Sequence, residues 1–99
     1  MWKKAAKVGD FDKLSAQLVP HESGDIAIFK NGETFCAIAN KCPHKGASLA
    51  EGHLENGIVT CPWHAWQFDV ASGVCQNVPG IQQKIYPAKI EAKDIYLDI

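Results

Sequence analysis

Short runs of apolar and β-branched residues, bounded by glycine, proline and asparagine, recur along the whole chain. Such runs are typical of β-strands joined by tight turns. The clearest pair covers residues 25–30 and 33–39, and Asn31-Gly32 between them favours a type I′ hairpin turn. No window of useful length has the 3.6-residue period of a helix, although residues 10–14 can form one turn.

Other short strands follow from the same pattern. They are predicted at residues 2–8, 16–19, 53–55, 58–60, 66–70, 74–76, 84–90 and 95–99. A second turn pair, Asn56-Gly57, separates two of these strands, and Pro87 favours an edge strand or a bulge. Many short strands at close intervals predict an all-β fold, with small antiparallel sheets arranged as a sandwich or barrel.

Length and composition indicate one globular domain over residues 1–99. The chain has 46% hydrophobic and 21% charged residues and a formal net charge of −1, so nothing favours nucleic acid or an anionic membrane as a partner. No stretch approaches the roughly 20 apolar residues of a membrane span, and no apolar run follows the N-terminal lysines. We therefore expect a cytoplasmic protein.

The four cysteines fall into two kinds. Cys36 and Cys75 lie inside strand-like runs and are expected to be small core residues, although their sequence leaves other roles open. Cys42 and Cys61 each begin a segment that also contains a histidine, within loops predicted at about residues 40–53 and 61–66. Structural disulfides are rare in the cytosol, so the second pair points to a metal.

The spacing of this pair defines the candidate ligands. Cys42-x-His44 is followed, after sixteen residues, by Cys61-x-x-His64, so each loop brings one thiolate and one imidazole. Such a set suits either structural zinc or an iron–sulfur centre. The mixed halves favour iron and sulfur, because zinc sites of this composition more often pair Cys with Cys and His with His. A two-iron cluster can take both cysteines on one iron and both histidines on the other.

The two loops resemble the cluster-binding motifs of Rieske proteins. The residues that carry the resemblance are Cys42-Pro43-His44-Lys45-Gly46 and Cys61-Pro62-Trp63-His64-Ala65-Trp66. Val78-Pro79-Gly80, in a loop at about residues 76–81, matches the third loop that shields the cluster in this family. The resemblance implies a Rieske domain with one [2Fe–2S] cluster, bound by Cys42, His44, Cys61 and His64.

Departures from the family pattern indicate a low reduction potential. High-potential Rieske proteins have two further cysteines that link the loops, where this chain has Ala47 and Trp63. They also have a serine and a tyrosine that donate hydrogen bonds near the cluster, where this chain has Trp66 and Phe68. Fewer donors leave the added electron less stabilised, so we expect a potential near the lower end of the Rieske range.

The resemblance is nearest to the Rieske-type ferredoxins of bacterial oxygenase systems and to the small subunit of assimilatory nitrite reductase. It implies a one-electron carrier between a reductase and a terminal oxygenase, or a non-catalytic nitrite reductase subunit. A zinc-stabilised binding module is the remaining alternative. We do not expect an enzyme, because Rieske oxygenases add a mononuclear iron site in a larger domain and only His21 and His53 remain here.

Overall fold

The computed structural model describes residues 1–43, 46–63 and 65–99. Within these residues it contains ten β-strands, two short 3₁₀ helices and no α-helix. The elements are β1 (Trp2–Lys7), η1 (Val8–Phe11), β2 (Ala16–Val19), β3 (Ile26–Asn31), β4 (Thr34–Ala39), η2 (Leu49–Glu51), β5 (His53–Glu55), β6 (Ile58–Thr60), β7 (Gln67–Asp69), β8 (Ile85–Tyr86), β9 (Ala88–Glu91) and β10 (Asp94–Asp98). The predicted all-β class is confirmed.

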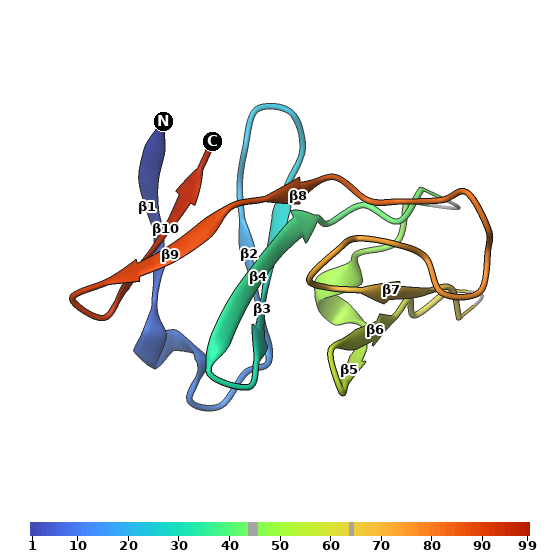
Figure 1. The fold of residues 1–99 in the computed structure, drawn as a ribbon, viewed down its shortest axis with the longest axis horizontal. Helices are drawn as coiled ribbons and strands as arrows, with labels where there is room; N and C mark the ends of the chain where they lie inside the picture. Colours follow the sequence, from blue (N-terminus) through green and yellow to red (C-terminus); the bar gives the residue numbers. More distant parts are fainter. Residues whose placement is uncertain (44–45, 64) are drawn as a thin grey trace.

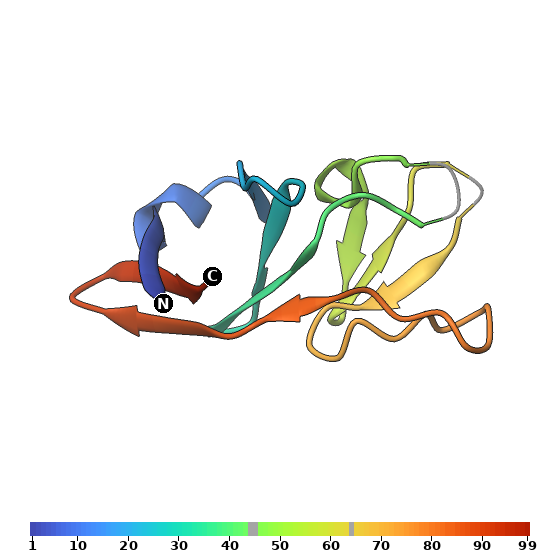
Figure 2. The same cartoon turned by 90° about the horizontal axis from the view of Figure 1, so that it is seen from above.

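The strands form three antiparallel sheets, with the orders β1-β10-β9, β2-β3-β4-β8 and β5-β6-β7. Figure 1 shows the first sheet and the second side by side, with β5, β6 and β7 at the other end of the molecule. Figure 2 confirms this arrangement from above: both chain termini lie at the end away from β5–β7. The third sheet and the loops around it therefore form a separate small unit.

Strand β3 divides two hydrophobic cores, because both of its faces are buried. Ala27 and Phe29 point into the core that contains β5–β7 side chains, whereas Ile26 and Ile28 point into the core shared with the first sheet. Full burial on both sides explains why this strand is apolar at four consecutive positions. The second sheet thus contributes side chains to both cores, and the small unit packs against one of its faces.

The chain passes from the second sheet to the first at Pro87. Before it, β8 pairs with β4; after it, β9 pairs with β10. The predicted continuous strand over residues 84–90 is therefore two strands, because proline has no N–H group with which to continue a ladder. The expectation of an edge strand here is confirmed, because β8 and β9 each lie at the edge of their sheet.

The two Asn-Gly pairs form different turns. Asn56 and Gly57 both have positive φ, 53° and 78°, as the predicted type I′ turn requires. Asn31 instead pairs with Thr34, so the loop residues are Gly32 and Glu33, and only Gly32 (64°) has positive φ. The turn lies one residue later than predicted and has the φ pattern of a type II′ turn.

Two smaller expectations differ from the structure, and one short element was not predicted. The helical turn expected at residues 10–14 begins earlier, as η1 over Val8–Phe11, and η2 was not predicted. Residues 74–76 make only the isolated bridges Phe68–Cys75 and Val74–Gln82 instead of a strand.

No helix among the described residues has the length and apolarity needed to cross a bilayer.

Gly52 is required by a close approach of two backbone segments. Its φ of −80° is available to any residue. A Cβ atom at this position would lie 2.2 Å from the carbonyl oxygen of Thr60, where real contacts are excluded. The glycine therefore lets the chain after η2 pass directly against the end of β6, which leads into Cys61.

Replacement of this glycine is predicted to destabilise the fold. Gly52→Ala should lower the free energy of unfolding by about 2 kcal/mol, because backbone must move to admit the methyl group. Denaturant unfolding measures the change. Gly9→Ala is the control, since a Cβ atom there meets nothing within 4 Å and no loss is expected. Equal stability of the two variants would contradict the close-approach argument.

Candidate metal centre

The first ligand loop is closed on itself by backbone hydrogen bonds. The Cys42 amide donates to the carbonyl of Ala47 (2.8 Å), and the Gly46 amide donates back to the carbonyl of Cys42 (2.8 Å). Gly46 has φ of 78°, a conformation in which glycine is favoured. Cys42 thus lies at the base of a tight loop.

The second ligand loop is closed in the same way. The Cys61 amide donates to the carbonyl of Trp66 (2.7 Å), again five residues further along the chain. Ala65 provides the positive φ, 57°, near the end of this loop. Each loop therefore begins with a cysteine held at its base, and each encloses one of the predicted histidines in sequence.

The two cysteine side chains meet. Cys42 and Cys61 are 1% and 2% exposed, both are free thiols, and their side chains lie within hydrogen-bonding reach of each other. Burial raises the pKa of the Cys61 thiol; a hydrogen bond with the Trp63 backbone opposes the rise, and the Cys42 thiol adds to it. Both thiols must lose their protons to bind a metal, so a bound cation would replace those protons.

The predicted histidine ligands, His44 and His64, lie outside the described residues, as does Lys45. Across residues 1–43, 46–63 and 65–99, no group of three or more His, Cys, Asp and Glu side chains is placed to hold a metal ion. The structure therefore brings together the thiol half of the predicted ligand set, while the imidazole half remains a prediction.

The two other histidines have their own partners. His21 shares a hydrogen bond of 2.7 Å with the hydroxyl of Ser23. His53 is 75% exposed and pairs with Glu55 at 3.3 Å. Both lie outside the two closed loops: His53, at the end of the predicted segment 40–53, is the first residue of β5.

The remaining cysteines are parts of the core. Cys75 is buried in the same hydrophobic cluster as Cys42 and Cys61, and Cys36 packs against it. Burial raises the pKa of the Cys36 thiol, which keeps it protonated and unreactive at neutral pH. Their predicted place in the core is confirmed.

Apolar side chains from the second ligand loop and from a third loop pack against the core that contains the buried thiols. Val78, Ile81 and Trp66 pack against the cluster that contains them, and the Cys75 amide closes this loop with a hydrogen bond to the carbonyl of Ile81 (2.8 Å). Trp63, in contrast, is 53% exposed. The predicted segment 76–81 is therefore a compact loop beside the site.

Gln83 ties this region to the first ligand loop and was missed by the sequence analysis. Its buried side-chain amide donates to the carbonyls of Ala39 and Lys41, both at 2.8 Å, across more than 40 residues of sequence. The Asn40 side chain holds the other end of the loop, accepting a hydrogen bond from the Ala50 amide at 2.8 Å. Nothing in the local sequence distinguishes these two residues, because their partners lie 10 to 44 positions away in the chain.

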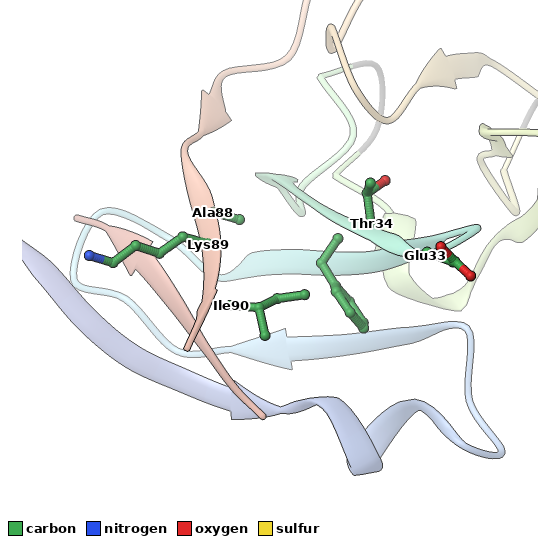
Figure 3. A pocket seen from close by; sticks show the side chains of 6 residues that line it. Glu33, Thr34, Ala88, Lys89 and Ile90 are labelled. Atoms are coloured by element: carbon green, nitrogen blue, oxygen red, sulfur yellow. The ribbon is translucent and has the colours of Figure 1, made fainter. Parts of the chain in front are cut away.

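The donor chemistry fits an iron–sulfur centre. Two thiols free of any disulfide are soft ligands for iron or zinc, and both are buried in a hydrophobic cluster. The pocket drawn in Figure 3, of about 190 Å³, lies elsewhere, between β4 and β9. Its lining residues are Glu33, Thr34, Phe35, Ala88, Lys89 and Ile90, none of them a predicted ligand.

Comparison with known proteins agrees with this chemistry. Residues 1–90 match the model of a family described as the Rieske [2Fe–2S] domain. Over 97 residues the chain is 33% identical to the biphenyl dioxygenase ferredoxin subunit of Pseudomonas sp. (strain KKS102), covering 96% of this chain and 89% of that protein. The Sphingomonas yanoikuyae B1 ferredoxin has a TM-score of 0.89 at 26% identity, covering 100% of this chain and 99% of that structure.

A further relative is much longer. The chain is 36% identical over 75 residues to apoptosis-inducing factor 3 of Homo sapiens. That alignment covers 75% of this chain but only 12% of the relative. The similarity therefore concerns one domain of that protein.

Removal of the Gln83 amide is predicted to weaken the fold around the first ligand loop. Gln83→Leu leaves two backbone carbonyls without their donor and should lower the free energy of unfolding by about 2 kcal/mol. Gln82→Leu is the matched control, because the exposed Gln82 side chain bonds only the carbonyl of Ser72; a change within about 0.5 kcal/mol is expected there. Equal losses in chemical denaturation would disprove the assigned role of Gln83.

Proposed function

The chain belongs to the Rieske [2Fe–2S] domain family, and from this premise we propose that it is a one-electron carrier between a reductase and a terminal oxygenase or similar redox enzyme. The observation that carries the proposal is the meeting of two buried free thiols, Cys42 and Cys61, at the bases of two loops closed in the same way. The ferredoxin subunit of biphenyl dioxygenase, related over nearly its whole length, supports the choice of partners.

A Rieske domain implies a [2Fe–2S] cluster, and we assign its ligands to this chain. Cys42 and Cys61 would bind one iron, and His44 and His64 the other. When bound, the cluster accepts and releases one electron. The chain holds the thiols together in a hydrophobic cluster against which Val78 and Trp66 pack, and these side chains would limit the access of water to the centre. Electron transfer requires no separate substrate site.

The ligand choice determines the potential. Four thiolates give an oxidised [2Fe–2S] centre a net charge of about −2, whereas two thiolates and two neutral imidazoles bring it to about zero. Adding an electron to a neutral centre costs less Coulomb energy, so the potential rises above the roughly −400 mV of all-cysteine ferredoxins. In this chain, Phe68 is fully buried and has no hydroxyl group to donate a hydrogen bond.

The other functions considered for this sequence have less support. A zinc-stabilised module does not explain the family match over residues 1–90. A nitrite reductase subunit is the less favoured alternative, because relatives of similar length include oxygenase ferredoxin subunits. Size exclusion of the native protein separates a free carrier from a subunit of a permanent assembly. We also propose a cytoplasmic location, which suits four unpaired cysteines.

The ligand assignment predicts the iron content of variants. The purified protein should be reddish brown, with about two iron atoms per chain and an EPR signal only after reduction. Cys61→Ser, His44→Ala and His64→Ala should each lose the iron and the visible absorbance. His53→Ala is the control and should keep both, because His53 is paired with Glu55 on the surface. Unaltered iron and spectrum in either ligand-histidine variant would refute the assignment.

The hydrogen-bond pattern predicts the reduction potential. With no disulfide between the loops and no hydroxyl at Trp66 or Phe68, we expect a midpoint between about −150 mV and zero. Redox titration followed by circular dichroism or EPR measures it. A midpoint well above zero would show that other groups stabilise the reduced state.

A further inference from the structure

One exposed side chain, Asn77, makes three hydrogen bonds around the second ligand loop. Its Oδ1 atom accepts from the backbone amide of Gln67 (3.1 Å) and from the thiol of Cys75 (3.4 Å). Its Nδ2 atom donates to the carbonyl of Ala65 (3.0 Å), twelve residues earlier in the chain. The Gln67 and Ala65 contacts lie on either side of Trp66, whose carbonyl closes the loop.

These partners require an asparagine in one orientation. The backbone N–H group of Gln67 can only donate a hydrogen bond, so it must face the side-chain oxygen of Asn77. The carbonyl of Ala65 can only accept, so it must face the side-chain nitrogen. An aspartate would keep the first contact and lose the second.

Ala65 occupies a conformation that needs support. Its φ of 57° lies in the left-handed region, which costs free energy for any residue with a Cβ atom. The residue is exposed, so hydrophobic packing contributes little to holding it there. It directly follows His64 in the sequence, and its backbone direction therefore sets where the chain leaves that residue.

We propose that Asn77 is a positioning residue for the metal centre: through the Ala65 carbonyl it holds the strained turn that follows His64 and so fixes the second ligand loop on the cluster. This inference rests on the proposed ligation by His64. The Asn77 side chain acts on the loop backbone and does not touch the iron.

The position of Asn77 explains why its loss would affect the centre more than the fold. The side chain is exposed and bonds mainly exposed groups, which contribute little to the stability of the cores. The loop that it braces carries two of the four proposed ligands. Its removal therefore frees the end of that loop while the sheets remain intact.

The test compares iron retention and the EPR spectrum of the intact, cluster-containing protein. Asn77→Ala removes all three hydrogen bonds but acts on the loop through the Ala65 bond, so it should release iron to a chelator about tenfold faster, the factor expected from that one bond, and should broaden the reduced-state EPR signal. Gln82→Ala is the matched control, because Gln82 makes a similar side-chain bond to Ser72, outside the ligand loops. It should match the wild type in both measurements.

A second substitution distinguishes positioning from general loosening. Glycine adopts positive φ without strain, so in the Ala65→Gly variant the turn should keep its conformation without the hydrogen bond from Asn77. In the Asn77→Ala background it should restore most of the iron retention and narrow the EPR signal. Failure of this rescue would overturn the proposed route through Ala65.

A third variant covers the case in which Asn77→Ala does not assemble. Asn77→Asp keeps the acceptor for Gln67 and Cys75 but cannot donate to Ala65, so it should fold normally and still show an altered EPR signal. Gln76→Glu adds a negative charge one residue earlier, away from the Ala65 carbonyl, and corrects for charge alone. If the Asn77→Asp variant gave the same signal as this charge control, the inference would be overturned.

The outcomes also separate this inference from the proposed function. A wild-type protein without the Rieske EPR signal would overturn the proposed function and the inference together. A normal wild-type signal, unchanged in every Asn77 variant, would overturn the inference alone.

Discussion

The metal centre depends on one constraint: two loops separated by more than a dozen residues must bring their thiols together and keep them out of water. The β5–β6 hairpin reverses the chain between them, with Asn56-Gly57 at its turn. Each loop is then closed by a hydrogen bond from its own cysteine amide, which restrains the backbone at both cysteines.

Features encoded over a few residues were predictable from the sequence. The type I′ turn at Asn56-Gly57 follows from the two residues themselves, and the edge position of the strands around Pro87 follows from its missing N–H group. The turn after Asn31 was placed one residue early, because the pairing of Asn31 with Thr34 sets the register there. Local chemistry thus predicts that a turn exists, while its register depends on the partner strand.

Features encoded over long sequence distances were not predictable. Gln83 reaches two carbonyls more than 40 residues away, and Asn77 reaches Ala65 across twelve. In the sequence both are polar residues among other polar residues, with no period or motif that distinguishes them from solvated side chains. The candidate ligand cysteines stood out in the sequence because coordination chemistry restricts residue type and spacing, whereas a backbone carbonyl accepts a hydrogen bond from any suitably placed amide.

The position of β3 between two cores explains how such a small unit can hold a redox centre. Strands β5, β6 and β7 have three residues each, too few for a sheet of this size to be stable alone. Their core is completed by Phe29 from β3 and Ile38 from β4, and the buried thiols belong to the same cluster. The other face of the second sheet packs against β1, β9 and β10 in a separate core. A cluster bound by the proposed ligands would therefore add to the stabilisation that the second sheet gives the small unit, and metal binding would be coupled to local folding.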